Sequence, residues 1–269
     1  TQVWNIGLPG RLAAIDRKDA TLPTVELPGD CRLTLLSPDH DRLLDLKDNW
    51  AKELKAAGVR SGNFAQLRER LADSRNLRPL GDVLGAEDDF DLEAPASDET
   101  DIDLADTLGR GTGEPGADAP FGGDTSRANG SSIALLLEYP ASKPEVRFLL
   151  AGDAWASVLE TSLARLLKPG ARLSLNGFKL PHHGSVANIS EALLERLKCS
   201  NYLISTNGAI FGHPHARCVE LLLKTHSGQG KPRLHFNYLV TSTEAWSKPA
   251  DQSARGYVAF HPTGLSLEF

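Results

Sequence analysis

The chain has 269 residues, of which 41% are hydrophobic, and this is enough apolar material for a complete core and too much for a wholly disordered protein. Its longest apolar runs are strand-sized, far below the roughly 20 residues that cross a bilayer, which excludes a membrane-spanning helix. The three scattered cysteines exclude a disulfide framework, and the absence of a signal-like start predicts a cytoplasmic protein with no membrane partner.

The negative charge is concentrated in one segment. Between Asp82 and Asp106 there are eleven acidic residues and no Lys or Arg, and removing these acids changes the net charge from −6 to +5. The segment continues into a stretch rich in Gly, Pro and Ala over 109–123. Because such a composition cannot bury enough apolar surface to order itself, we predict an acidic disordered insert over 82–127. Two roles stay open, a solvated loop without a task and an acidic mimic that covers a basic groove.

The residues before the insert have the patterns of folded elements. A β-rich alternation over Arg32–Leu36 predicts a strand. Helical spacing of apolar residues after Ser37-Pro38-Asp39 predicts a helix over Asp39–Ala57, and a second helix is predicted over Phe64–Ala72. The sequence therefore predicts one segment of strands and helices over residues 1–81.

After the insert, predicted strands and helices alternate. Strands are predicted over Ser132–Tyr139, Val146–Ala151, Leu173–Leu180, Asn201–Thr206, Arg233–Thr241 and Gly256–Phe269. Helices are predicted over Trp155–Leu167, Ile189–Lys198 and Ala216–Thr225. This alternation predicts an α/β layered architecture.

Two of the predicted strands end in groups that can bind metal. Asp153 follows a buried strand that ends in Ala151-Gly152, although a Gly-Asp pair is also common in turns and helix caps. His182 and His183 follow the strand ending at Leu180, and neutral imidazole nitrogens bind zinc at about 2.0–2.1 Å. Taken alone, a His-His pair is equally typical of a protein surface.

A third strand ends in small polar residues. Ser205, Thr206 and Asn207 follow Ile204, and His213 comes soon afterwards in a loop held by Gly and Pro. Three successive strands thus bring polar or ionisable groups to one edge of the sheet, and this joint arrangement favours a functional site more strongly than any single part.

These motifs resemble a known family. The order strand-Gly-Asp, helix, strand-Pro-His-His-Gly-Ser, helix, strand-Ser-Thr and Gly-His-Pro is similar to the C-terminal half of metallo-β-lactamase-fold proteins, especially the branch of DNA-uptake competence proteins. The resemblance covers about Asn129 to Leu223, and Leu33–Pro38 with the helix containing Trp50 resembles the segment that joins the two halves. It implies an α/β fold, the second half of an αββα sandwich, with a mixed sheet and helices outside. The domains would be a joining segment (1–81), the insert (82–127) and the C-terminal half (128–269).

The resemblance also implies roles for individual residues. Asp153 would bridge two divalent metal ions, zinc with manganese as the alternative, and His183 would be a ligand of one of them. Asp153, His183 and His213 are the expected catalytic residues. The expected substrate-binding residues are His182, Ser185, Ser205, Thr206, Asn207, Asn129 and Ser132. Asn129 and Ser132 stand where many relatives carry another metal-binding His, which puts the second metal in question.

One motif of the family is absent. The His-x-His-x-Asp-His metal motif belongs to the first half, and none of the eight histidines here has that spacing. We therefore expect an N-terminal partner half that carries it, with this chain, which starts at Thr1 and lacks Met, as one piece of a cut protein. The expected function is a metal-dependent phosphodiesterase or nuclease that acts on nucleic acid, is activated by a protease and serves antiviral defence. The alternatives are a non-catalytic binding or regulatory module and a hydrolase of a small ester, lactone or lactam.

Overall fold

A computed structural model describes residues 13–19, 21–56, 58, 123–208, 211–228 and 230–261. The chain divides into two compact units, residues 1–43 with 105–269, and residues 44–104. In the second unit the described residues are the part of α1 (His40–Ala56) from Leu44 onwards, and Gly58. The predicted helix over Phe64–Ala72 and most of the predicted insert lie outside the described residues.

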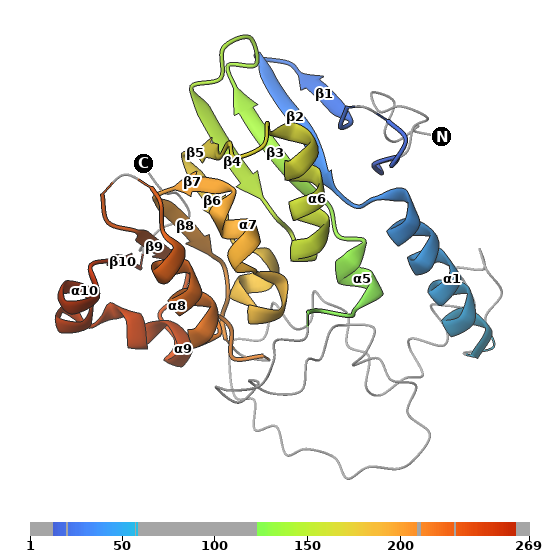
Figure 1. Cartoon of the computed structure of the whole chain (residues 1–269). Helices are drawn as coiled ribbons and strands as arrows, with labels where there is room; N and C mark the ends of the chain where they lie inside the picture. Colours follow the sequence, from blue (N-terminus) through green and yellow to red (C-terminus); the bar gives the residue numbers. More distant parts are fainter. Residues whose placement is uncertain are drawn as a thin grey trace. The chain divides into compact units, whose positions relative to one another are not determined.

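The first unit is built on a mixed sheet of eight strands in the order β1-β2-β3-β4-β6-β8-β9-β10 (Figure 1). The strands are β1 (Thr24–Leu27), β2 (Cys31–Ser37), β3 (Ala134–Tyr139), β4 (Val146–Leu150), β6 (Gly177–Lys179), β8 (Asn201–Ile204), β9 (Arg233–Phe236) and β10 (Val258–Phe260). Pairs from β1 to β4 are antiparallel, and pairs from β4 to β10 are parallel. The predicted α/β architecture with a mixed sheet is confirmed.

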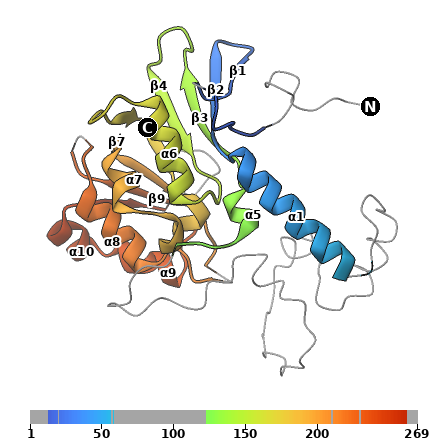
Figure 2. The ribbon, with the colours of Figure 1, turned by 45° about the vertical axis from the view of Figure 1, so that its right-hand side comes forward.

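Helices connect the parallel strands on one face of this sheet (Figures 1 and 2). The helices after the insert are α5 (Arg127–Gly130), α6 (Ala156–Leu166), α7 (Glu191–Glu195), α8 (Ala216–Thr225), α9 (Thr241–Glu244) and α10 (Pro249–Arg255), with short 3₁₀ turns η2 (Pro181–Gly184), η3 (Val186–Asn188) and η4 (Ala245–Ser247). The strand order from β4 to β10 advances in one direction. Because crossover connections between parallel strands share one hand, their helices fall on the same face.

The core lies between that face and the helices. In register across the sheet, Leu149 lies between Leu136 and Phe178, and all three are buried. Phe178 pairs in turn with the buried Tyr202. Since successive residues of a strand point to opposite faces, this row of alternate positions forms the inner face of the layer.

The segment around β6 differs from the prediction in two places. The predicted strand over Leu173–Leu180 is two strands, because β5 (Leu173–Leu175) leaves the main sheet and pairs with β7 (Leu197–Cys199). The predicted helix over Ile189–Lys198 ends at Glu195. In β7 the buried Leu197 and Cys199 flank the exposed Lys198, a period of two that suits a strand and overrides the helical spacing.

The predicted insert ends at residue 127, whereas the described part of the chain resumes at Gly123. The structure describes the chain from Gly123, and the Ser126 side chain accepts from the Asn129 backbone N–H at the start of α5. The Asp124 side chain is only 6% exposed. A capping serine and a buried carboxylate place these residues in the folded part.

No helix in the described ranges combines the length and apolar character that crossing a membrane requires.

The burial of His235 in β9 should make the stability of the fold depend on pH. Its ring is buried, stacks on Phe260, and places Nε2 3.1 Å from the Asn201 Oδ1. Burial, reinforced by the charge of Arg233, lowers the pKa of His235 from 6.5 to about 4. The unfolded chain therefore takes up this proton at a higher pH than the folded chain, so the histidine's contribution to stability is lost as pH falls from 6.5 to 4. The free energy of unfolding, measured with urea at several pH values, should fall less between pH 6.5 and 4 in His235→Gln than in wild type. An equal fall in both proteins would contradict the prediction.

Candidate functional site

The candidate site lies where the parallel strands β4, β6 and β8 end. Leu150 is in register with Lys179, and Lys179 with Leu203, so the carboxyl ends of these strands lie at one edge of the sheet. The loops that follow carry Asp153, the His182–His183 pair and Ser205. The sequence-based prediction that polar groups of three strands meet at one edge is confirmed, and ligands bind at this edge in open α/β sheets.

The loop after β6 has an unusual backbone. His182 and His183 both have positive φ, 43° and 57°, a region that non-glycine residues rarely occupy. The His182 N–H donates to the Gly152 carbonyl oxygen at 2.9 Å, which ties this loop to the loop after β4. At Gly184, φ is 86° and an added Cβ would come within 2.7 Å of the Pro214 Cβ. Backbone strain of this kind gathers at functional sites.

His183 is exposed and its ring is fixed by one hydrogen bond. Its Nδ1 contacts the backbone carbonyl oxygen of Ser205. Because a carbonyl oxygen only accepts, Nδ1 must carry the proton, and in the neutral ring Nε2 keeps its lone pair. A backbone carbonyl on one nitrogen and an open lone pair on the other is the arrangement of a metal-binding histidine.

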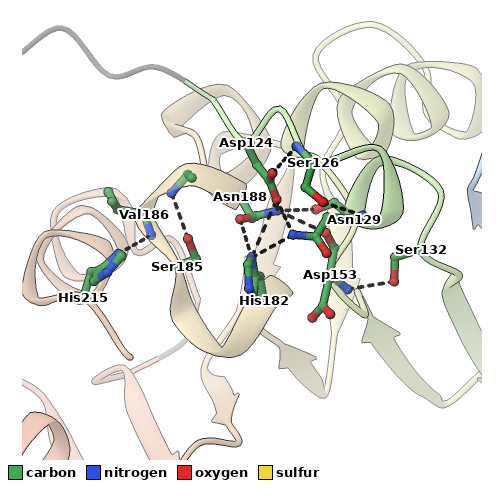
Figure 3. A network of polar contacts seen from close by, with 12 residues as sticks. Asp124, Ser126, Asn129, Ser132, Asp153, His182, Ser185, Val186, Asn188 and His215 are labelled. Atoms are coloured by element: carbon green, nitrogen blue, oxygen red, sulfur yellow. Dashed lines mark hydrogen bonds and ion pairs between the residues drawn. The ribbon is translucent and has the colours of Figure 1, made fainter. Parts of the chain in front are cut away.

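His182, by contrast, is buried in a network of side chains shown in Figure 3. Its Nδ1 lies 3.1 Å from the Asn188 Oδ1, 3.3 Å from the Asn129 Nδ2 and 3.6 Å from the Asp124 Oδ2. Asn129 and Asn188 each donate from Nδ2 to Asp124 Oδ2 at 2.8 Å. The carboxylate of Asp124 thus gathers three polar side chains in a buried space.

This network shifts two pKa values in opposite directions. Burial alone would raise the pKa of Asp124, but hydrogen bonds from His182, Asn188 and Asn129 outweigh it and lower that pKa. Burial alone would lower the pKa of His182, but the hydrogen bond to Asp124 and the charge of Asp153 outweigh it and raise that pKa. Both directions favour a charged pair.

Asp153 is half-buried and held through its backbone. Its N–H donates to the Ser132 Oγ at 3.0 Å, which places Ser132 directly behind the candidate ligand. Among the described residues no hydrogen bond reaches the carboxylate oxygens of Asp153, and Figure 3 shows this carboxylate turned away from the Asp124 network. Its negative charge acts on the half-buried Lys179 amine, whose pKa burial lowers. The carboxylate is available to a ligand.

The His213 ring lies beside the histidine pair. Its centroid is 5.1 Å from that of His182, 6.3 Å from that of His183 and 4.6 Å from that of His215. Burial, with the neighbouring imidazoles, lowers the pKa of His213 to about 3. His213 is therefore neutral near pH 7 and can serve the site as a hydrogen-bonding group.

The remaining predicted site residues shape the loops. Ser185 accepts from the Ala187 N–H through Oγ, and Thr206 donates from Oγ1 to the His213 carbonyl oxygen. Asn207 is exposed in the loop after β8. Contact of these residues with a substrate stays a prediction.

Sequence reasoning missed four residues of this region, Asp124, Asn188, His215 and Asn237. Asp124 was assigned to the acidic insert, although the capping serine two residues later could have marked the start of the fold. The Asn188 side chain links Asp124 to the backbone carbonyl of Asp153, and Asn237 accepts from the Thr206 N–H at 2.7 Å. His215 Nδ1 accepts from the Val186 N–H. An isolated asparagine gives no sequence signal of such a role.

The capacity of this site for metal is limited. In the parts of the chain that the structure describes, no group of three or more His, Cys, Asp or Glu side chains is arranged to hold a metal ion. Asp153 and His183 have the chemistry of ligands, but zinc sites in proteins take three or four protein ligands. These residues therefore fit part of a metal site.

Gly152, immediately before Asp153, gives a stability prediction. Its φ is 54°, and an added Cβ would lie 2.6 Å from the Ile133 carbonyl oxygen and 2.7 Å from the Ser132 Oγ. Gly170 is a matched control, with φ of 76° and nothing within 4 Å. A left-handed backbone costs an alanine about 1–2 kcal/mol at either position, and only Gly152→Ala adds the clash. Urea unfolding should show a larger loss of free energy of unfolding in Gly152→Ala than in Gly170→Ala. Equal losses in the two variants would contradict the close contact of residue 152 with Ile133 and Ser132.

Comparisons with protein-family models, with curated proteins and with solved structures found no match. The function must therefore be argued from the residues of the site, since a fold class alone does not fix chemistry.

Proposed function

We propose that this chain is the second half of a metal-dependent phosphodiesterase of the metallo-β-lactamase type, which cleaves nucleic acid when another segment completes its metal site. The observation that carries the proposal is the pairing of two open ligands at one strand edge. The His183 ring is fixed through Nδ1 by the Ser205 carbonyl, and the Asp153 carboxylate accepts no hydrogen bond from the described residues. Both groups follow adjacent parallel strands.

The number of ligands supports a second contributor. Two ligands are fewer than a zinc site requires, so the proposal assigns the others to an N-terminal half with a His-x-His-x-Asp-His motif. When bound, two divalent metal ions would supply an activated water and offset charge on the phosphoryl oxygens. The role of this chain is to hold the two ligands in place. The Ser132 hydroxyl holds Asp153, and the Ser205 carbonyl holds His183.

The sheet itself supports a second layer. Leu135, Leu137 and Leu150 alternate with the inner-face residues and so lie on the face opposite the connecting helices. Leu150 is 37% exposed, and Leu135 and Leu137 are partly buried. In the αββα sandwich that we propose, the sheet of the other half would cover this aliphatic face and gain from its burial.

Charge supports nucleic acid as the substrate. The residues outside the acidic stretch from Asp82 to Asp106 carry a net charge of +5, and net positive charge attracts phosphodiester backbones. The neutral His213 and the nearby hydroxyl groups suit hydrogen bonds to phosphate oxygens.

The test is an activity panel on the assembled protein, in which this chain is expressed together with the proposed N-terminal half. Bis(p-nitrophenyl) phosphate, single-stranded DNA, duplex DNA, RNA and a lactone would each be offered with zinc or manganese. We expect cleavage of phosphodiesters that a chelator abolishes. Hydrolysis of the lactone alone would replace the proposed substrate class, and a protein inactive on every substrate at full metal content would favour a non-catalytic binding module.

A further inference from the structure

The two most exposed large hydrophobic side chains among the described residues are neighbours in the chain. Tyr238 is 55% exposed and Leu239 is 61% exposed, and both lie in the loop between β9 and α9. Within the described ranges, no hydrogen bond or ring contact involves the Tyr238 side chain. Together the two side chains form an apolar patch that the packing of the fold does not use, and such patches mark binding surfaces.

The backbone under this patch is held by hydrogen bonds. The buried Thr243 hydroxyl donates to the Tyr238 carbonyl oxygen at 2.8 Å and accepts from the Val240 N–H at 2.9 Å, so one side chain closes the turn over 238–240. Ser242 donates from Oγ to the His213 carbonyl oxygen at 2.6 Å, which joins α9 to the loop after β8. The turn is therefore fixed before any ligand binds, and this lowers the entropy that binding costs.

The patch lies next to the candidate site. β8 and β9 are parallel neighbours in register, so the loops that follow them start side by side. Asn237 accepts from the Thr206 N–H at 2.7 Å, and the preceding residue, Ser205, fixes the His183 ring. Neighbouring strands lie about 4.8 Å apart, so the ends of β6 and β9, two strands apart, are separated by about 10 Å. Nucleotides next to a bound phosphodiester would reach across this distance.

The charge around the patch suits a nucleic acid strand. Residues 196–243, which carry both loops, contain six basic residues and one acidic residue, Glu220. The loops themselves, over 205–215 and 237–243, contain no acidic residue, so a backbone phosphate would meet no like charge from them. An unpaired base offers a flat face that stacks on an aromatic ring, whereas the bases of a duplex are stacked inside it. The patch therefore fits a single strand better than a duplex.

We propose that Tyr238 and Leu239 form a stacking platform for an unpaired nucleobase, which makes a single-stranded nucleic acid the substrate of the site. The Tyr238 ring stacks on the base, and Leu239 packs beside it. The platform holds a nucleotide close to the phosphodiester that is cleaved. This inference rests on the proposed function and names its substrate class.

The first test is binding without cleavage. The full chain, in the presence of a chelator, would be titrated into fluorescein-labelled oligothymidylate and oligouridylate of about 12 nucleotides, a length within the usual site sizes, and into a DNA duplex of equal length. Fluorescence anisotropy reports binding, and the two single strands separate DNA from RNA. We expect Tyr238→Ala to weaken single-strand binding by about fivefold or more, the loss of one stacked base, and to leave duplex binding unchanged. Tyr238→Phe should stay within about twofold of wild type, because stacking uses the ring and not the hydroxyl.

The matched control is Tyr139→Ala. Tyr139 is 49% exposed and pairs with Val146 at the start of β4, so it lies at the opposite edge of the sheet from the site. Its loss should not affect single-strand binding. Photocrosslinking of a strand that contains 5-iodouracil, followed by mass spectrometry, should attach the base to Tyr238. Wild-type binding of single strands by Tyr238→Ala, an equal loss on the duplex, or a wild-type chain that binds no single strand would overturn the platform.

Kinetics of the assembled protein separate this inference from the proposed function. We expect Tyr238→Ala to raise KM for a single-stranded oligonucleotide by about fivefold or more with little change in kcat, the effect of losing binding that the ground state and the transition state share. Cleavage with an unchanged KM would overturn the platform and leave the proposed function in place. Tyr238-dependent binding by a protein that cleaves no phosphodiester would support the platform and overturn the proposed function. A Tyr238→Ala chain that binds single strands normally but fails to assemble would assign the patch to the N-terminal half and overturn the inference.

Discussion

Asp153→Asn and His183→Ala should each lower metal content and phosphodiester cleavage by more than about 100-fold in the assembled protein, because each removes a direct ligand. Neither change should affect folding much. The Asp153 carboxylate accepts no hydrogen bond from the described residues, and the His183 side chain is exposed. The loss of activity would therefore reflect the metal site rather than the stability of the sheet.

The matched control is His226→Ala. His226 follows α8 and bonds through Nδ1 to the Tyr202 hydroxyl, away from the strand ends that carry Asp153 and His183. Metal content measured by mass spectrometry and cleavage rates would be compared for the three variants. Wild-type metal content and rate in either ligand variant would remove that residue from the proposed site.

Phe178→Ala should destabilise the first unit by about 3–5 kcal/mol, the usual cost of truncating a buried phenylalanine. Phe178 is 0% exposed in the central strand β6, between Leu149 of β4 and Tyr202 of β8. The ring fills the space between the sheet and its helices, so its removal leaves a cavity where three strands meet the helix layer.

The control for this prediction is Leu239→Ala, at a residue that is 61% exposed. Its cost should stay within about 0.5 kcal/mol, as for other surface substitutions. Urea unfolding followed by circular dichroism measures both. A Phe178→Ala cost as small as that of Leu239→Ala would mean that the core does not run through β6.

The parts of the fold that could be predicted were those set by local pattern. The helix over Ala216–Thr225 was predicted with the observed bounds, because its apolar spacing is clear over the whole length. The strand ends that carry Asp153 and His183 were also predicted, because buried strands give continuous apolar runs. Parallel pairing then explains why these ends meet at one edge.

The parts that could not be predicted depend on contacts between distant segments. β7 is a strand because it pairs with β5, which nothing near Leu197 reveals. Asp124 looked like one more acid of a charged stretch until the fold placed it against Asn188 and His182. Long-range hydrogen bonds of this kind have no periodic signature in the sequence.

The most direct test of the central claim is the position of zinc in the assembled protein. A crystal structure of the zinc-loaded protein, with anomalous scattering recorded at the zinc edge, would locate the ions. We predict zinc about 2.0–2.2 Å from the His183 Nε2 and from an Asp153 carboxylate oxygen, with the remaining ligands on the other segment. Zinc bound elsewhere, or a complete metal site that includes neither Asp153 nor His183, would contradict the account.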